Sequence, residues 1–194
     1  MILVEVHDGL FSDAFRISPA AGSTSWRLLT VCDADLPKGV NITLDAVVAV
    51  CPMLREAFEL IGSNHFEDFD LLMQDILRRA PSGLPWDRLF DDKHLHEVGN
   101  VTVARLSGKS ERWKLFQFEK QRTLVRVLWS YGSGRKTLLL THVFIKPGGR
   151  KKTPRNELER ARKILERYLE AVDTGQAQLI YAQGGRDGFV KLGH

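Results

Sequence analysis

Three residues in the second half of the chain have side chains suited to chemistry at a phosphate group: Arg126, His142 and Lys146. Arginine carries a permanent charge on a planar fork that matches phosphate oxygens, and lysine supplies a point charge. Histidine gains and loses protons near neutral pH. Such a set suits a reaction in which charge on a phosphorus centre is stabilised while protons move.

Two strands that we expect on either side of the turn at 132–135 determine whether these side chains meet. Successive side chains of a strand point to opposite faces of a sheet. An even register brings Arg126 near His142 and Arg122 near Lys146, whereas a slip of one residue separates them. Both registers are compatible with the sequence. Arg126 as a solvent-facing strand arginine and His142 as a hydrogen-bonded core histidine are the structural alternatives.

A basic turn follows the second of these strands and contains Lys146, Arg150, Lys151 and Lys152. Four cations beside the start of a helix are unfavourable for the helix dipole. The turn therefore favours an anionic ligand over a merely solvated loop.

Aromatic residues also lie in the expected strands, among them Trp129, Tyr131, Phe116 and Phe118. Exposed aromatic rings can stack on the bases of single-stranded RNA. Aromatic residues in strands more often belong to the core, and we expect this for most of the four.

Other sequence patterns point away from metal and nucleotide cofactors. His94 and His96 have no cysteine or third ligand nearby in the sequence, which disfavours a metal site. The segment 132–137 lacks two glycines of a phosphate-binding loop and is better explained as a hairpin turn. We therefore expect no metal and no other cofactor.

Charge is distributed unevenly along the 194 residues. Residues 1–80 contain 6 basic and 12 acidic residues, and residues 81–194 contain 22 and 12, so the second half carries a net charge of +10. A basic half suits a phosphate-rich partner, because each contact releases a counterion. A solvated basic face without such a partner is the equally weighted alternative. Cys32 and Cys51 lie among apolar residues and are expected to be buried free thiols. With no secretory signal or membrane span in the sequence, we expect a cytoplasmic protein.

Hydrophobic periodicity and turn residues predict an acidic N-terminal segment followed by helices, strands and a final helix. Thr153 and Pro154 are expected at the N-cap and first position of that last helix, which ends at Gly175. The predicted elements are strands at 2–6 and 26–32, a helix at 44–61 broken or kinked at Pro52, a helix at 67–79, strands at 101–106, 113–119, 123–131 and 137–145, and the last helix.

Residues 95–172 resemble toxins of the RelE/HigB superfamily, in its phage-associated HigB-like branch. The resemblance rests on a strand arginine, a glycine turn, a His-x-Phe-x-Lys strand end and a Lys-Thr-Pro helix start. The string LFQFEKQR departs from the family's Glu-Leu-Arg, with Arg122 as a possible substitute, and a PGGR run interrupts the basic turn. The matching residues are Arg126, Gly132, Gly134, His142, Phe144, Lys146, Lys152, Thr153, Pro154, Glu157 and Ala161.

The resemblance implies an α+β fold in which helices precede a twisted antiparallel sheet of about four strands and a C-terminal helix. It divides the chain into an acidic extension (1–62), a toxin-like domain (63–175) and a tail (176–194). It also implies a metal-independent endoribonuclease that cleaves mRNA on the ribosome and is restrained by an antitoxin protein. A gyrase inhibitor of the same fold and a regulatory RNA-binding module are the alternatives.

The same resemblance assigns roles to individual residues. It makes Arg126, His142 and Lys146 the catalytic residues. The residues expected to bind RNA are Arg122, Trp129, Tyr131, Arg150, Lys151 and Lys152. For residues 1–60 we consider two roles equally: shielding the basic domain or docking a partner, or simply adding strands and core.

Overall fold

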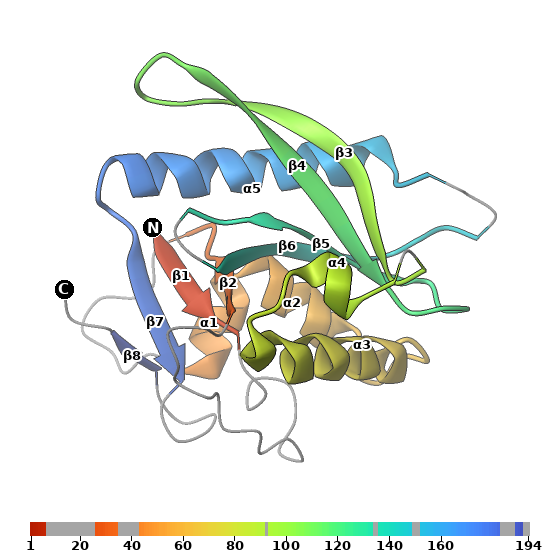
Figure 1. The fold of residues 1–194 in the computed structure, drawn as a ribbon. Helices are drawn as coiled ribbons and strands as arrows, with labels where there is room; N and C mark the ends of the chain where they lie inside the picture. Colours follow the sequence, from red (N-terminus) through yellow and green to blue (C-terminus); the bar gives the residue numbers. More distant parts are fainter. Residues whose placement is uncertain are drawn as a thin grey trace.

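The structure is a computed structural model of the chain (Figure 1). It describes residues 1–6, 26–34, 43–91, 93–133, 136–148, 152–182 and 189–191.

One mixed sheet of eight strands organises the molecule, in the order β3-β4-β5-β6-β2-β1-β7-β8. The pairs β2–β6 and β1–β7 are parallel, and every other neighbouring pair is antiparallel. The strands are β1 (Ile2–Glu5), β2 (Arg27–Val31), β3 (Leu95–Ala104), β4 (Ser110–Glu119), β5 (Val125–Tyr131), β6 (Thr137–Ile145), β7 (Gln178–Ala182) and β8 (Phe189–Lys191).

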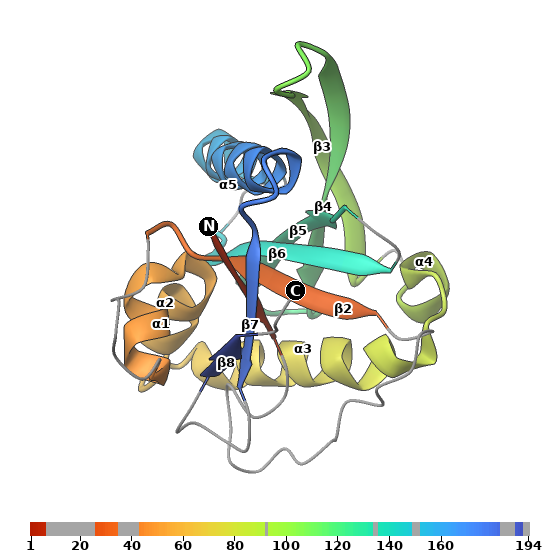
Figure 2. The same ribbon diagram turned by 90° about the vertical axis from the view of Figure 1, so that its left-hand side faces the viewer.

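Helices cover both faces of this sheet and give three layers (Figures 1 and 2). The long helix α5 lies on one face, and α1 to α4 lie on the other. The β3–β4 hairpin projects past α5 at one edge (Figure 2). The helices are α1 (Leu44–Val50), α2 (Pro52–Glu59), α3 (Phe66–Arg79), the 3₁₀ turn η2 (Ala80–Ser82), α4 (Trp86–Leu89) and α5 (Arg155–Asp173). Among the described residues, no helix has both the length and the apolar character required to span a bilayer.

Local sequence explains most helix boundaries. Pro52 lacks an N–H group, so it ends the pattern of α1 and occupies the first position of α2. Helix α3 carries acidic residues in its first turn and Arg78 and Arg79 in its last, as the helix dipole favours. Helix α5 buries a stripe that includes Ala161 and Leu165.

Two hydrophobic cores lie on the two faces of the sheet. One packs α5 against residues such as Leu29, Leu115 and Leu128. The other packs α1 to α4 against the opposite face, around Trp129 and Phe118. Strands β5 and β6 are covered on both sides, which explains their nearly continuous apolar sequence. Cys32 and Cys51 are buried free thiols, as expected.

The predicted fold class is wrong. The sheet is neither four-stranded nor antiparallel, because β2 pairs in parallel with β6 and β1 pairs in parallel with β7. A RelE-like arrangement of four antiparallel strands therefore does not describe this protein. The error arose because local patterns predict strands, whereas pairing between distant strands depends on tertiary contacts.

The N-terminal residues contribute the centre of the sheet. Strands β1 and β2 lie between β6 and β7, and α1 and α2 pack beneath them. This placement corresponds to the second of the two roles considered for residues 1–60, the addition of strands and core. The segment after α5 contributes β7, which pairs with β1, and β8 at the edge.

A bulge in β6 changes which face its side chains occupy. Leu128 of β5 pairs with His142, but Trp129 pairs with Leu140, so Thr141 is the extra residue. His142 therefore faces α5, whereas Leu140 packs on the side of α1 to α4. Strict alternation along the strand would have put Leu140 and His142 on one face, and the bulge separates them.

Candidate functional site

A polar network begins on the α5 face of β4, where Gln117 and Glu119 occupy alternate positions at the end of the strand. Their neighbours Phe116 and Phe118 pack on the opposite face. Helix α5 begins beside this point, and Thr153 donates from its Oγ1 to Oε1 of Gln117 at 3.0 Å. Thr153 is thus not the N-cap of α5, a position that Pro154 occupies, and its hydroxyl instead ties the helix start to β4.

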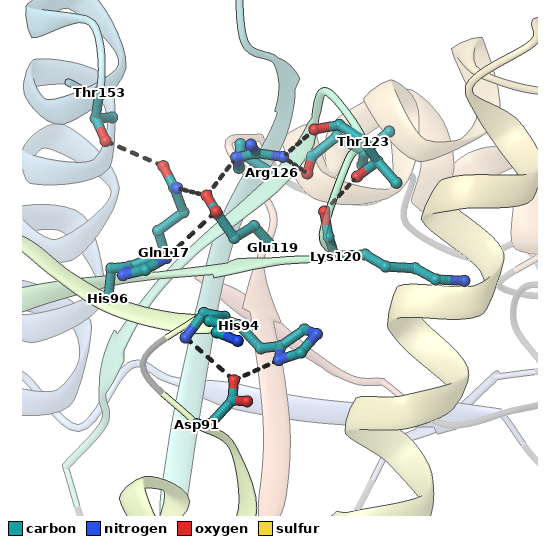
Figure 3. Close-up of polar contacts among 11 residues, drawn as sticks. Asp91, His94, His96, Gln117, Glu119, Lys120, Thr123, Arg126 and Thr153 are labelled. Carbon is teal, nitrogen blue, oxygen red and sulfur yellow. Dashed lines mark hydrogen bonds and ion pairs between the residues drawn. The ribbon is translucent and has the colours of Figure 1, made fainter. Parts of the chain in front are cut away.

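The carboxylate of Glu119 is the centre of this network (Figure 3). Its Oε2 accepts a hydrogen bond from Nε2 of Gln117 at 2.7 Å and lies 2.7 Å from Nε of Arg126. Its Oε1 lies 3.3 Å from Nε2 of His96 on the edge strand β3. One carboxylate oxygen thus faces the interior, and the other faces a histidine.

Arg126 supports Glu119 from inside the protein. Its side chain is 8% exposed, and Nη1 donates to the carbonyl oxygens of Thr123 and Val125 at 2.8 and 2.7 Å. Burial lowers the pKa of Arg126, and the neighbouring Glu119 opposes this change. The expected role in phosphate contact does not fit a guanidinium enclosed in this way. Its contacts suit the positioning of Glu119.

His96 is the accessible member of the network. Its side chain is 37% exposed, against 18% for Glu119. A carboxylate beside an imidazole orients the ring. His94, two residues earlier, uses a different carboxylate and lies 2.5 Å from Oδ1 of Asp91 through Nδ1 (Figure 3). Within the part of the chain that the structure describes, no three His, Cys, Asp or Glu side chains gather as a metal site would require.

Cations surround this end of the sheet, which we call the basic end and define by Lys120, Arg122, Lys146 and Lys152. The β4–β5 turn and the start of the β6–α5 segment are adjacent, because the amide of Lys146 donates to the carbonyl of Leu124 at 2.8 Å. Arg122 and Lys152 are exposed, and Lys120 and Lys146 are partly exposed. Arg150 and Lys151 lie outside the described residues.

His142 occupies a different environment from the basic end. Its side chain is completely buried, with Nε2 3.0 Å from Oε2 of Glu157 and Nδ1 3.2 Å from the hydroxyl of Thr141. Burial lowers the pKa of His142, and the hydrogen bond to Glu157 opposes the change. The hydrogen bond to His142 in turn lowers the pKa of Glu157. His142 and Arg126 lie on one face of the sheet, as the even register predicts. Both side chains are buried.

The two aromatic residues expected to stack on RNA differ in exposure. Trp129 is fully buried, with its ring centroid 4.6 Å from that of Phe116 and 5.0 Å from that of Phe118. It is part of the core. Tyr131 is 40% exposed at the other end of β5, and its ring lies 5.9 Å from that of Trp26. The structure therefore separates Tyr131 from the basic end by the length of the strand.

Sequence reasoning missed His96, Gln117 and Glu119 as a group. His96 was considered only as a metal ligand, and the string LFQFEKQR only as a departure from a family pattern. The usable signal was the alternation Phe-Gln-Phe-Glu, which puts two polar side chains on the otherwise apolar α5 face beside a basic turn. The contact between Glu119 and His96 could not be predicted in this way, because it depends on the β3–β4 register, in which His96 lies opposite Gln117.

No protein-family model matches the chain, and no curated protein or solved structure is significantly similar to it. The chemistry of the site must therefore be judged from its own geometry. An accessible histidine held by a supported carboxylate can transfer protons, and the surrounding cations can hold a polyanion.

Proposed function

We propose that the protein binds RNA at the basic end and cleaves it without a metal ion, with His96 transferring protons and Glu119 orienting it. The observation that carries the proposal is the accessible His96–Glu119 pair, Nε2 to Oε1 3.3 Å, beside a group of cations. Lys120, Arg122, Lys146 and Lys152 contact phosphates in this proposal. Arg126 and Gln117 position Glu119, and His142 has a structural role.

The reaction needs no external reactant. The ribose 2′-oxygen attacks the adjacent phosphorus, and its proton passes to a base. The bond from phosphorus to the 5′-oxygen breaks, and that oxygen takes up a proton. The products are a 2′,3′-cyclic phosphate and a 5′-hydroxyl. His96 serves one of the two proton transfers, and the cations stabilise charge on the phosphorane.

The resemblance to RelE/HigB toxins motivates the biological setting of the proposal. In that setting the substrate is mRNA on the ribosome, the outcome is inhibition of translation, and an antitoxin protein restrains the activity. Two observations run against this setting: the sheet is not the RelE-like one that the resemblance implies, and Arg126 and His142, two residues of the implied catalytic set, are enclosed. The enclosure favours a second candidate, a protein that binds RNA or another polyanion through the basic end without cleaving it.

The proposal is tested in two assays: purified protein with an end-labelled RNA in EDTA, and purified protein with translating ribosomes in a magnesium buffer without EDTA. We expect cleavage products with a 2′,3′-cyclic phosphate, and no cleavage of an oligonucleotide with 2′-deoxyribose throughout. His96→Gln and Glu119→Gln should lose cleavage but still bind RNA, and the control His65→Gln on the N-terminal side of α3 should behave like the wild type. Binding without cleavage under every condition would support the second candidate, and blocked DNA supercoiling would point to gyrase.

A further inference from the structure

A cleft opens beside the basic end, between α3 and the β4–β5 turn. Its volume is about 240 Å³. Its wall includes Leu71, Gln74 and Arg78 of α3, with Phe90, His94 and Lys120 opposite. In Figure 3, the side chain of Lys120 extends from the turn toward α3, and His94 lies in the same region.

The charges that line this cleft favour an anionic ligand. Lys120 and Arg78 contribute two cations, and the ring of His94 in the same wall contacts Asp91 through Nδ1. The carboxylate of Asp75 also lines the cleft, but it is paired with Nε of Arg79 at 3.4 Å. Lysine and arginine on opposite walls can contact one phosphate from two sides.

The remaining surface of the cleft suits a flat, partly apolar group. Phe90 is buried, and its ring centroid lies 5.7 Å from that of Trp86 and 4.5 Å from the guanidinium carbon of Arg79. Leu71 is 36% exposed. The amide nitrogen of Gln74 donates to Oδ2 of Asp70 at 2.7 Å, which fixes the amide and leaves its oxygen as an acceptor.

Size limits the ligand further. Pockets for drug-sized molecules usually span about 300–1,000 Å³. The cleft is smaller and is partly open to solvent. A single unit of a polymer with one phosphate and one planar ring meets these conditions.

We propose that this cleft binds one nucleotide of the RNA strand, next to the phosphate that is cleaved. Lys120 and Arg78 bind its phosphate, Leu71 and Phe90 contact the base, and the amide oxygen of Gln74 accepts a hydrogen bond from a base amino or imino group. The subsite rests on the proposed function for its place on an RNA strand. It adds a determinant of which nucleotide lies beside the cleavage point.

Binding of nucleoside 5′-monophosphates to the full chain, measured by calorimetry and by NMR, tests the subsite without cleavage. We expect one site with a preference among the four bases, weaker binding of inorganic phosphate, and weaker binding of the unphosphorylated nucleosides. Arg78→Ala should reduce affinity at least about tenfold, since a charge-assisted contact is lost. The matched control Arg112→Ala, on the projecting hairpin, should not. Gln74→Ala should weaken the base preference.

The outcomes separate this subsite from the proposed function. If monophosphates bind as expected but wild-type protein cleaves no RNA, the cleavage proposal fails and the nucleotide site stands. If RNA is cleaved while Arg78→Ala and Gln74→Ala change neither monophosphate binding nor the nucleotide at the cleavage point, the subsite is wrong and the cleavage proposal stands. Equal binding of inorganic phosphate and all four monophosphates would contradict the role of Gln74, Leu71 and Phe90.

Discussion

Two histidine–carboxylate pairs lie on the same face of the sheet but in opposite environments. His142 and Glu157 are 3.0 Å apart, with the histidine fully buried. His96 and Glu119 are 3.3 Å apart, with the histidine 37% exposed. The strands explain the difference, since β6 lies inside the sheet and β3 lies at its edge. A histidine and a glutamate can therefore stabilise the fold where they are buried, whereas the same two residue types at an exposed edge remain accessible to a substrate.

The largest expected effect concerns activity at the exposed pair. His96→Gln should reduce RNA cleavage about 10²–10⁴-fold, the usual contribution of a general acid or base. Its unfolding temperature should remain close to that of the wild type, because the ring is partly solvated. Single-turnover cleavage and thermal unfolding measure the two quantities. If His142→Gln lost cleavage as fully as His96→Gln while keeping its fold and its RNA affinity, the activity would belong to the buried pair and not to the exposed pair.

The next effect concerns stability at the buried pair. His142→Ala should lower the free energy of unfolding by about 2–4 kcal/mol, because it leaves a cavity and removes the partner of Glu157. Urea denaturation at pH 7.5 measures this change. His96→Ala is the matched variant and should lower stability much less. Equal losses in the two variants would show that burial does not distinguish the pairs.

Stability should also depend on pH through the buried histidine. Folding lowers the pKa of His142 below its ordinary value of 6.5, so the unfolded chain takes up a proton more readily. The contribution of His142 is therefore fully present above pH 6.5 and declines as the pH falls below it. Glu56, whose pKa is raised by burial, acts in the opposite direction and is present in every variant. The difference between wild type and His142→Gln reports the histidine together with its effect on Glu157, whose pKa the hydrogen bond to His142 lowers.

Unfolding free energies at pH 7.5 and 5.5 give this measurement. Wild type should lose more stability between the two values than His142→Gln does, and His65→Gln should lose as much as wild type. An identical pH dependence in wild type and His142→Gln would mean that His142 titrates alike in the folded and unfolded states.

The smallest effect concerns the basic end. Each phosphate contact on single-stranded RNA contributes about 0.7 to the slope of log affinity against log salt. Lys120→Ala and Lys152→Ala should each reduce that slope by roughly this amount, and His142→Gln should not change it. Lys163→Ala, on the exposed side of α5, is the charge-matched control. A slope that falls equally for Lys163→Ala would indicate binding to a diffuse basic surface.

Part of this arrangement follows from local sequence. The apolar stripes of α3 and α5 and the apolar runs of β5 and β6 predict those elements, because their periods reflect which side is buried. The polar start of β3, around His96 and Glu97, has no such pattern and was not predicted. It becomes a strand because β4 pairs with it through nine residues of each strand.

The candidate site was harder to predict than the helices. The side on which His142 lies depends on the bulge at Thr141, a shift of one residue in pairing that alternation along the strand does not reveal. The enclosure of Arg126 depends on carbonyl groups of Thr123 and Val125 that only the folded turn presents. Charge, by contrast, is a property of composition, and the basic second half was evident without a structure.

The position of the N-terminal strands has a consequence for the newborn chain. Arg27 pairs with Thr137 and Ile2 with Gln178, so β2 and β1 wait for parallel partners made more than a hundred residues later. At about 5–20 residues per second, that delay is about 5–35 seconds. Until then, apolar strand edges stay open to chaperones or to neighbouring chains. The sheet can close only after β7 has been synthesised, because β1 lacks its parallel partner until then.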